Sequence, residues 1–333
     1  MSWQLLASQN ALQKRSGLYK TIRKFFDDKK VLEVETPLLS YASVTDPFIN
    51  SFEVYEAGSN NLEKKLYLQT SPEYAMKRML CSGAGSIFQI CKAFRCEEIG
   101  TRHHVEFSIL EWYRIDFDLQ DLMNEMAELL CLILNLDHNN KNIIFTTYRQ
   151  LFLDYCKFDY NLVDNDFLKK LIKQLFNDIF DNILDDQNFD SLNTKDDLLM
   201  ILLSHYIEPK MAELAKNKIL FLYNYPATQA ALAKLEVVDG YQIAKRFEVY
   251  FNGVELANGF QELSDADEQE SRFIKDLQQR EKLGLPSVNI DQRFLAGLKQ
   301  GLPNCSGVAL GLDRLLMQQM GLNNIEDVIS FRF

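Results

Sequence analysis

Long β-type runs joined by short polar loops constrain the fold of this chain most strongly. Residues 87–97 and 106–113 are two such runs, and the polar loop between them predicts an antiparallel pair. A further run over residues 245–262 is interrupted by Asn252-Gly253, which predicts a two-residue hairpin turn. Strands and helices do not alternate as they do in βαβ units. We therefore predict an α+β fold, with an antiparallel sheet flanked by helices.

Helices are predicted from apolar spacing and from the residues that favour helix ends. One helix should begin at residues 71–73, with Ser71 as its N-cap and Pro72 at its first helical position. Residues 160–215 are interpreted as an acidic, solvated helical insertion within a single domain spanning residues 1–333. The other predicted helices cover residues 11–30, 118–136, 267–283 and a segment ending near Gly321, and the other predicted strands cover residues 31–36, 66–69, 219–223 and 307–311.

Charge and cysteine usage restrict the functional classes. The chain has 36 Lys and Arg against 47 Asp and Glu, a net charge of −11, whereas a large nucleic-acid-binding face needs clustered basic side chains. No signal peptide is recognisable, and the longest apolar stretch, residues 129–134, is far shorter than the roughly 20 residues that span a bilayer. The 6 cysteines form no CxxC pair. We therefore expect reduced thiols in a cytoplasmic protein without a membrane segment.

Two arginines are candidates for binding phosphate. Arg95 lies in the first β-type run and shares strand parity with Glu97, so both side chains should project from one face. An ordinary cross-strand ion pair is the simpler interpretation of that stretch taken alone, although an Arg that faces a pocket binds phosphate bidentately. Arg314 follows the Gly-rich strand 307–311 and lies in the first turn of a helix, where backbone amides favour anions.

Three glutamates are candidates for binding a cation. A turn at Asn252-Gly253 makes Glu248 and Glu255 diagonal neighbours on one sheet face. Adjacent carboxylates repel each other unless a cation lies between them, and such hard oxygen ligands suit Mg²⁺ that bridges to phosphates. Strict alternation sends Glu262 to the opposite face unless a bulge or strand end occurs at residues 258–259. An exposed edge hairpin is the alternative, but the flanking residues are too apolar for it.

Together and in this order, these stretches resemble the catalytic core of the class II aminoacyl-tRNA synthetases. The three motifs of that core match the helix and strand ending at Pro37, residues 94–107, and residues 307–314. Residues 31–37, 70–73, 110–113 and 255–260 look most like lysyl-tRNA synthetase. The resemblance runs from about residue 12 to the end, so few residues precede the first motif and we expect neither an anticodon-binding domain nor tRNA binding. The chain looks like the truncated lysyl-tRNA synthetase relatives that attach β-lysine to a lysine side chain of elongation factor P.

The resemblance implies roles for individual residues. It implies ATP and Mg²⁺ as cofactors, with Arg95 on the α-phosphate, Arg314 on the γ-phosphate and adenine face, and Phe107 stacked on the adenine. Glu248 and Glu255 would hold Mg²⁺. Further ATP-site positions are Cys96, Glu97, His103, His104, Leu256 and Gly311. The amino-acid positions are Ser71, Pro72, Glu73, Tyr113, Glu262 and Ala309, where Glu73 takes the amino group near the carboxylate and Glu262 and Tyr113 take the distal ammonium.

The resemblance also implies a homodimer that pairs through residues 12–37, where the helix has apolar positions that look exposed. Some positions depart from the family pattern. His104, Val105 and Cys96 replace Asn, Pro and Asn of the relatives, which puts details of the ATP loop in doubt. Ala309 stands where tRNA-charging relatives usually have Gly, and we predict that its methyl group favours β-lysine over L-lysine. The alternative is that Ala309 merely packs under the sheet.

Two other functions stay open at this stage. One is an amino-acid-activating enzyme that still charges tRNA or a small amine. The other is a non-catalytic synthetase paralogue, which is disfavoured because Arg95, Arg314, Glu248 and Glu255 are all present. The residues themselves do not distinguish β-lysine from L-lysine; that preference comes from the resemblance.

Overall fold

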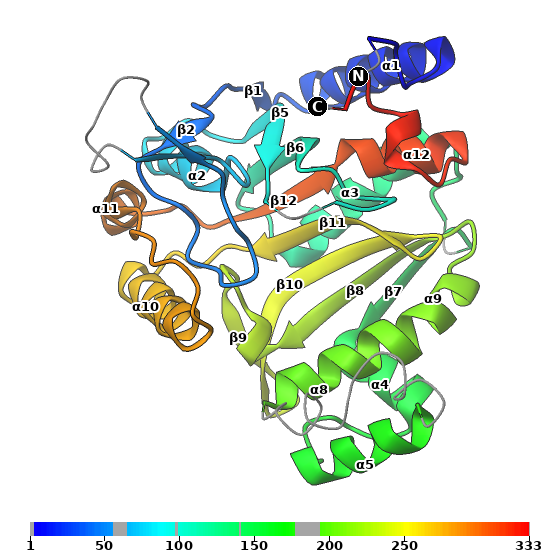
Figure 1. Ribbon diagram of the computed structural model, residues 1–333, viewed down its shortest axis with the longest axis vertical. Helices are drawn as coiled ribbons and strands as arrows, with labels where there is room; N and C mark the ends of the chain where they lie inside the picture. The colour runs from blue at the N-terminus through cyan, green and yellow to red at the C-terminus, as the bar shows by residue number, and fades with distance from the viewer. Residues whose placement is uncertain (1–2, 56–64, 97–98, 140, 177–193, 333) are drawn as a thin grey trace. The chain divides into compact units, whose positions relative to one another are not determined.

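The computed structural model describes residues 3–55, 65–96, 99–139, 141–176 and 194–332 (Figure 1). The chain divides into two compact units. The first unit comprises Met1–Asp137 and Leu256–Phe333, and the second comprises His138–Glu255.

The first unit is built on a sheet with the strand order β1-β5-β6-β12-β11. The strands are β1 (Leu32–Glu33), β5 (Ile87–Phe94), β6 (Glu106–Ile115), β12 (Cys305–Gly311) and β11 (Val254–Gln261, from Leu256 onward in this unit). The predicted β5–β6 pair is confirmed: it is antiparallel, from Ile87 opposite Tyr113 to Phe94 opposite Glu106. The sheet is not purely antiparallel, because the short edge strand β1 pairs parallel with β5.

Alternation along β6 separates a helix-covered face from a polar face. Trp112 is fully buried, packs edge-on against Phe26 of α1 (Gln9–Asp28), and donates to Glu125 of α3 (Leu119–Leu134) at 3.1 Å. The neighbouring residues Glu111 and Tyr113 therefore point to the other face of the sheet. The third helix near α1 and α3 is α12 (Leu312–Met320).

A buried carboxylate ties these elements together. Asp313, at the start of α12, accepts hydrogen bonds from Arg15 of α1 at 2.5 Å and from the Ser108 amide of β6 at 2.6 Å. It is 2% exposed, so its charge is neutralised by protein groups rather than by water. This contact fixes the beginning of α12, and hence the backbone that carries Arg314.

The apolar positions of α1 do not lie on the surface, contrary to the sequence interpretation. Leu18, Ile22, Phe25 and Phe26 are all buried within the first unit, because the helix lays this side against the sheet. Exposed apolar side chains lie on either side of the helix in the sequence: Trp3, Leu5 and Leu6 before it, and Leu32, Leu38, Leu39 and Tyr41 after it.

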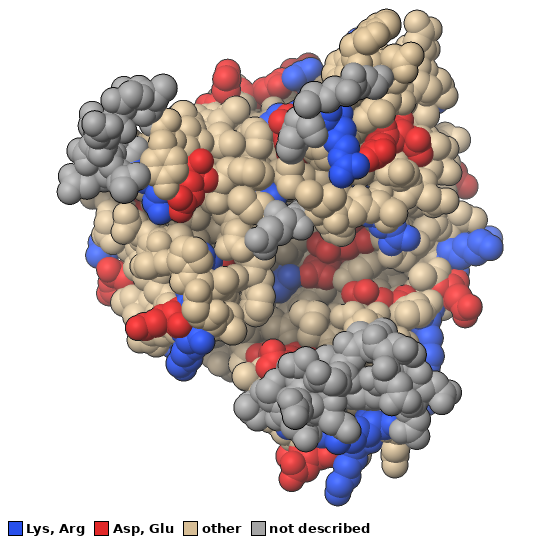
Figure 2. All heavy atoms as spheres, viewed as in Figure 1, with Lys and Arg blue, Asp and Glu red and all other residues tan. Residues whose placement is uncertain are grey.

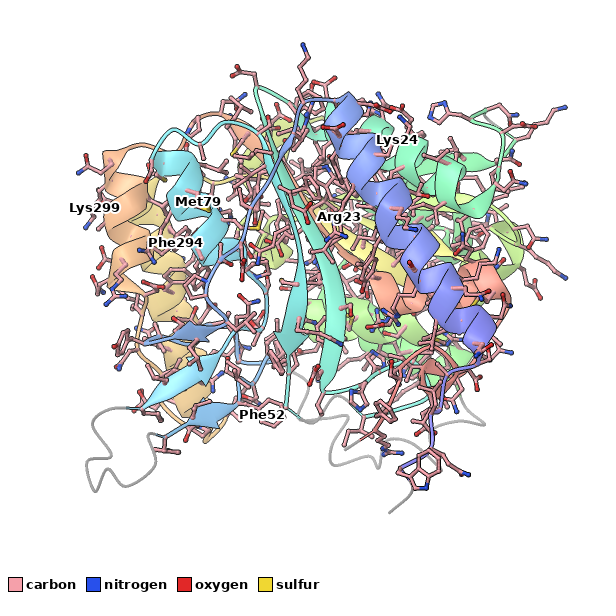
Figure 3. All side chains as sticks on the ribbon, turned by 90° about the horizontal axis from the view of Figure 1, so that it is seen from above. Arg23, Lys24, Phe52, Met79, Phe294 and Lys299 are labelled. Carbon is pink, nitrogen blue, oxygen red and sulfur yellow. The ribbon has the colours of Figure 1, made fainter. Side chains whose placement is uncertain are left out.

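On the other side of the unit, α2 (Glu73–Cys81) and α11 (Gln292–Gln300) lie side by side (Figure 3). Phe294 of α11 stacks on Tyr74 of α2, with ring centroids 4.6 Å apart. α10 (Ala266–Lys282) packs against α11. A separate three-stranded sheet of β2 (Leu39–Ser40), β4 (Leu66–Leu68) and β3 (Glu53–Val54) precedes α2, in the order β2-β4-β3.

The start of α2 differs from the prediction by one position. Pro72 occupies the N-cap and Glu73 is the first helical residue, so Ser71 is not the N-cap. The Ser71 hydroxyl nevertheless accepts from the Glu73 amide at 3.1 Å. The segment before the helix is held to the sheet because the Phe94 amide donates to the carbonyl of Gln69.

The second unit contains a sheet with the order β10-β8-β7. β9 pairs with the first residues of β10, from Tyr241 to Ala244. The strands are β7 (Ile143–Thr147), β8 (Ile219–Pro226), β9 (Leu235–Val238) and β10 (Tyr241–Phe251). The predicted turn at Asn252-Gly253 is confirmed, with φ angles of 50° and 71°, the left-handed values of a type I′ turn. The register of β10 against β8 shifts between Ala244 and Phe247, which marks a bulge at Arg246.

The described part of the predicted insertion is helical. Its elements are α5 (Asn165–Leu175), α8 (Lys195–Leu202), a π-helical turn (Leu203–Ile207) and α9 (Glu208–Leu214); α4 (Tyr148–Cys156) precedes them. Residues 177–193 of the predicted insertion lie outside the described residues. Across the described ranges, none of the helices has the length and apolar character needed to cross a membrane.

Candidate active site

The polar face of β6 carries two side chains that are bonded to each other. Tyr113 donates its hydroxyl to Glu111 Oε1 at 2.6 Å, and Ser71 donates its hydroxyl to Glu111 Oε2, also at 2.6 Å. Glu111 is 2% exposed, and each of its oxygens has a protein donor. Burial, followed by the charge of Glu73, raises the pKa of Glu111 to about 7. This carboxyl group therefore lies close to its titration point at neutral pH.

A buried lysine joins two further carboxylates. Lys77 Nζ lies 2.6 Å from Glu73 Oε1 and 2.5 Å from Glu262 Oε2, and the Lys77 side chain is fully buried. Glu73 and Lys77 share one face of α2 because they are one helical turn apart. Glu262 directly follows β11, where its amide donates to the carbonyl of Cys305. Burial raises the pKa of Glu262 to about 8, although the Lys77 ammonium opposes the rise.

Two small residues of β12 lie against these groups. Gly307 is opposite Tyr113 in the register and Ala309 is opposite Glu111, so both positions belong to the polar face. A Cβ atom at Gly307 would overlap the Tyr113 ring and come within 2.6 Å of Glu262 Oε1. Position 307 must therefore lack a side chain if Tyr113 and Glu262 are to lie where they do.

The structure thus brings together the residues predicted for the amino acid: Ser71, Pro72, Glu73, Tyr113, Glu262 and Ala309. It adds Lys77 and Glu111, which sequence reasoning missed. The available signal was periodicity, because Lys77 lies one helical turn after Glu73 and Glu111 lies two residues before Tyr113 on the same strand face. Three carboxylates and one ammonium leave an acidic, largely dehydrated cluster that suits a ligand with more than one ammonium group.

Neither a bulge nor a strand end occurs at residues 258–259 against β12. The register runs unbroken from Ala257 opposite Leu310 to Gln261 opposite Ser306. By alternation, Glu262 falls on the face of Asn258 and Phe260, which pair with Ala309 and Gly307. Its place in the acidic cluster follows from ordinary strand geometry.

Arg95 contacts the aromatic ring predicted to stack on adenine and the backbone just before Ser71. It follows the last residue of β5, and its Nε donates to the carbonyl of Thr70 at 3.4 Å. Its guanidinium carbon lies 5.1 Å from the centroid of the Phe107 ring. Phe107 shares the strand face of Glu111, about 14 Å away at 3.4 Å per residue. The polar face of β6 therefore offers an aromatic end and an acidic end, and Arg95 lies against the aromatic end.

Two of the other ATP-site candidates of the first unit, His103 and Gly311, lie next to Arg314. Arg314 Nη2 donates to His103 Nε2 at 2.5 Å, and its Nε donates to the carbonyl of Arg102 at 3.4 Å. Gly311 is opposite Ile109, and a Cβ there would lie 3.7 Å from the Leu256 carbonyl oxygen, an ordinary contact. His104 Nδ1 lies 2.8 Å from the carbonyl oxygen of Glu106. Cys96 donates its amide to Asn50 at 2.8 Å, and Glu97 lies outside the described residues.

The carboxylates predicted to bind Mg²⁺ belong to the second unit. Glu248 accepts from Arg246 at 2.5 Å and from the Tyr250 hydroxyl at 2.6 Å, one donor on each oxygen. Glu255 is half-buried. Its charge, like that of Glu248, raises the pKa values of Arg246 and Tyr250. Within the described residues, no group of three or more acidic, His or Cys side chains could hold a metal. Carboxylate oxygens are nevertheless ligands that Mg²⁺ accepts, and one or two carboxylates suffice where phosphate oxygens and water complete its shell.

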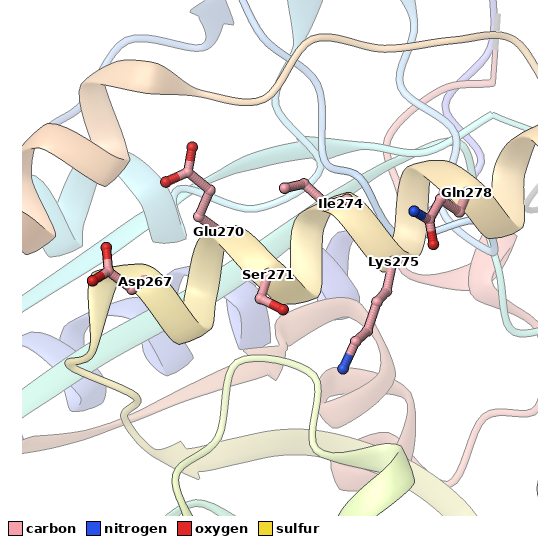
Figure 4. A pocket seen from close by; sticks show the side chains of 6 residues that line it. All are labelled: Asp267, Glu270, Ser271, Ile274, Lys275 and Gln278. Atoms are coloured by element: carbon pink, nitrogen blue, oxygen red, sulfur yellow. The ribbon is translucent and has the colours of Figure 1, made fainter.

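A further open hollow, of about 420 Å³, lies along α10 (Figure 4). Its lining residues are Asp267, Glu270, Ser271, Ile274, Lys275 and Gln278. All of them come from one helix, and none was predicted as a site residue. On the face drawn in Figure 2, basic side chains are scattered among acidic ones and form no single large patch.

Comparison with known proteins gives the family. Residues 2–332 match the family of class II tRNA synthetases (D, K and N). The chain belongs to this family. Class II membership accounts for the α+β fold and implies the use of ATP, typically with a divalent metal.

Several relatives of this chain share one name, elongation factor P–(R)-β-lysine ligase. The protein of that name from Proteus mirabilis is 45% identical over 330 residues, which cover 99% of this chain and 97% of the relative. Those from Pectobacterium atrosepticum and Salmonella typhi are each 44% identical, over 332 and 331 residues, with the same coverage.

Proposed function

We propose that this class II synthetase activates (R)-β-lysine with ATP and transfers it to a lysine side chain of elongation factor P. The name shared by relatives that match nearly the whole chain supports this function. The observation in the structure that carries it is the acidic cluster around Lys77, made by Glu73, Glu111 and Glu262. Once Glu111 and Glu262 have lost their protons, above their pKa values of about 7 and 8, three carboxylates and one ammonium leave two negative charges, which match the two ammonium groups of a diamino acid.

The reaction has two steps, both of which need positioning more than a protein nucleophile. In the first, a carboxylate oxygen of the amino acid attacks the α-phosphorus of ATP, and the bond to pyrophosphate breaks. In the second, the neutral amine of a protein lysine attacks the acyl carbon, AMP leaves with the electrons of the acyl–oxygen bond, and the amine loses a proton. Amide formation thus consumes one ATP and releases AMP and pyrophosphate.

The residues divide this work between them. Arg95, which contacts Phe107 and the carbonyl of Thr70, would bind the α-phosphate and the attacking carboxylate. Arg314 would bind the γ-phosphate, and Phe107 would stack on the adenine. Glu73 would accept the amino group near the carboxylate, while Glu262 and Tyr113 would accept the distal ammonium. A monoamine analogue would leave buried acceptors unpaired, which is what makes such a pocket selective.

Glu248 and Glu255 would hold Mg²⁺, which when bound neutralises the phosphate oxygens. Replacing Glu255 by Gln should raise the Mg²⁺ concentration that gives half-maximal activity at least about 10-fold. Loss of a residue that merely hydrogen-bonds to a metal ligand already lowers metal affinity about 10–100-fold, and Glu255 is itself a proposed ligand. The measurement is adenylation over a Mg²⁺ titration. Glu236→Gln is the matched control. Glu236 is an exposed residue of the same unit, and its carboxylate forms an ion pair with Lys245 at 2.6 Å. Equal Mg²⁺ requirements for both variants would contradict the assignment.

ATP–pyrophosphate exchange across a panel of lysine isomers tests the proposed function. We expect exchange with (R)-β-lysine and weaker exchange with L-lysine. A second assay follows transfer of labelled β-lysine to elongation factor P, with a variant of the acceptor lysine as the control. If no diamino acid supported exchange, the enzymatic proposal would be wrong. If tRNA rather than elongation factor P were labelled, the alternative synthetase function would replace it.

The pH dependence of amino-acid binding follows from the raised pKa values of Glu111, about 7, and Glu262, about 8. Burial is the main cause of both. Below these values the groups carry protons and cannot pair with ammonium, so the KM for the amino acid should fall as the pH rises from about 6 to 8. Initial rates at pH 6, 7 and 8, at saturating ATP, measure this change. A KM that does not vary over this range would show that neither carboxylate binds the substrate as an anion.

Ala309→Gly should move the preference toward L-lysine. The Ala309 methyl lies on the face of Glu111, its partner in the register, so it occupies space where the amino groups would bind. One methyl is worth about 1–3 kcal/mol of discrimination, so the ratio of the two kcat/KM values should change about 5- to 150-fold. Ala257→Gly is the matched control, because Ala257 pairs with Leu310 and belongs to the opposite face. An unchanged ratio would mean that Ala309 only packs under the sheet.

We also propose a homodimer. The exposed apolar residues Leu32, Leu38, Leu39 and Tyr41 support an interface that includes the segment after α1, rather than the buried side of that helix. Light scattering at micromolar concentration should give twice the mass of the 38.7 kDa chain. A monomer mass would contradict the proposal.

A cytoplasmic location is the last part of the proposal. All 6 cysteines are free of disulfides, as is usual for proteins kept in a reducing compartment. Thiol titration of protein purified without reductant, which should find 6 thiols under denaturing conditions, tests this expectation.

A further inference from the structure

Lys77 is the one charged side chain of the acidic cluster that the proposed function does not use. Its ammonium is fully buried and contacts two carboxylates from different segments, Glu73 of α2 and Glu262 after β11, at 2.6 and 2.5 Å. The ring of Phe294 lies on a third side, with its centroid 5.9 Å from Nζ. One carboxylate would be enough to neutralise a buried ammonium. The second contact therefore links two groups that the proposed function assigns to opposite ends of the substrate.

We propose that Lys77 is a positioning residue for amino-acid binding: its ammonium fixes the places of Glu73 and Glu262 and favours the ionised form of Glu262, so that the two side chains accept a substrate with two ammonium groups. This inference rests on the proposed function. Without Lys77, the buried carboxylate of Glu262 and the partly buried carboxylate of Glu73 would lie near Glu111 with no cation between them, and the cost of these like charges would be relieved by taking up a proton. A protonated carboxyl group is a poor partner for an ammonium group.

The surroundings of Lys77 support this role. The other titratable groups that act on Lys77 or Glu262 are Glu111 and Tyr113 of β6, Cys81 of α2 and Cys305 of β12. None of these groups is a second cation. Despite burial, Glu262 and Glu73 hold the pKa of Lys77 above its usual range, so its charge persists over the working pH range. The same ammonium opposes the upward shift that burial imposes on the pKa of Glu262.

The test is Lys77→Met, which keeps the length and volume of the side chain but removes its charge. At pH 7 we expect the KM for (R)-β-lysine in the exchange assay to rise at least 10-fold, with the KM for ATP changed less than 2-fold. The pH range over which the amino-acid KM falls should also move about one pH unit higher, because Glu262 without the Lys77 ammonium keeps its proton to a higher pH. If Lys77→Met does not fold, Lys77→Gln, which keeps a hydrogen-bond donor, serves for the same measurements.

Lys92→Met is the matched control, because Lys92 is an exposed lysine of β5 that lies 3.4 Å from Glu106, and we expect unchanged kinetics. A folded Lys77 variant with an unchanged KM and pH profile would overturn the inference. So would a fall in kcat with no shift of the profile, since that pattern reports a packing role only. If the unmodified protein showed no exchange with any diamino acid, the proposed function itself would fail, and this outcome is visible before any variant is compared.

Discussion

Replacing Arg314 by alanine should lower the rate of adenylate formation by at least about 10³-fold, in line with the loss of an arginine that neutralises transferring phosphates. Arg314 lies in the first turn of α12, whose start is fixed by the buried contacts of Asp313 with Arg15 and Ser108. The side chain donates to His103 and to the carbonyl of Arg102, and both hydrogen bonds are exposed to solvent. We therefore expect the free energy of unfolding to change by less than about 0.5 kcal/mol.

The measurement is ATP–pyrophosphate exchange at saturating β-lysine, with thermal unfolding of the same sample. Arg332→Ala is the matched control: this arginine forms an exposed ion pair with Glu326 at 2.7 Å, and such pairs contribute about 0–1 kcal/mol. Arg314→Lys should fall between the two, because lysine keeps the charge but loses the planar fork. Near-normal exchange in well-folded Arg314→Ala would show that this arginine does not bind the phosphates.

Local sequence patterns were sufficient where local chemistry decides the structure. The β5–β6 pair follows from two β-type runs and a polar loop, and the type I′ turn follows from Asn252-Gly253, two residues that tolerate positive φ. The same holds for α1, α3, α10 and α12, whose bounds lie within a few residues of the prediction. In each case the signal is contained within the segment itself.

Pairing between distant segments was not predictable in this way. β1 pairs parallel with β5, and β7 pairs parallel with β8, across stretches of chain that contain other elements. β7, β9, α4 and α11 were not predicted at all, because each is short and is stabilised mainly by what it packs against. The apolar residues of α1 looked exposed for a related reason: a sequence does not reveal which partner covers a helix face.

The candidate site shows the same difference between residues that local motifs identify and residues that only the fold reveals. Glu73, Tyr113 and Glu262 could be identified through family motifs, whereas Lys77 and Glu111 could not, because their importance depends on burial. An i,i+4 pair such as Glu73 and Lys77 is usually a surface ion pair of small energetic value. Only the fold shows that Lys77 is enclosed and that Glu262, from a distant segment, contacts it. Ionic groups acquire such roles from the low-dielectric environment that the tertiary structure creates.

Gly307→Ala should raise the KM for the amino acid at least about 100-fold while changing the KM for ATP less than about 2-fold. The new methyl would overlap the Tyr113 ring and lie 2.6 Å from Glu262 Oε1, so at least one of these groups must move. Both are proposed acceptors of the distal ammonium, and losing a buried hydrogen-bonded partner of a charged group costs about 2–3 kcal/mol or more. Overpacking adds about 1–3 kcal/mol of destabilisation, which should appear as a lower midpoint of thermal unfolding.

Gly17→Ala separates this steric effect from the general consequence of exchanging glycine for alanine. Gly17 lies in α1, where a Cβ would meet no atom within 4 Å, so that variant should be as stable as the parent or slightly more stable, with unchanged kinetics. The informative result is a raised KM for the amino acid with a nearly unchanged KM for ATP. Phe107 and Arg314 lie toward the other end of the sheet face, and the atoms nearest to a Cβ at position 307 belong to Tyr113 and Glu262. A Gly307→Ala enzyme that bound the amino acid normally would show that Tyr113 and Glu262 do not form the amino-acid pocket.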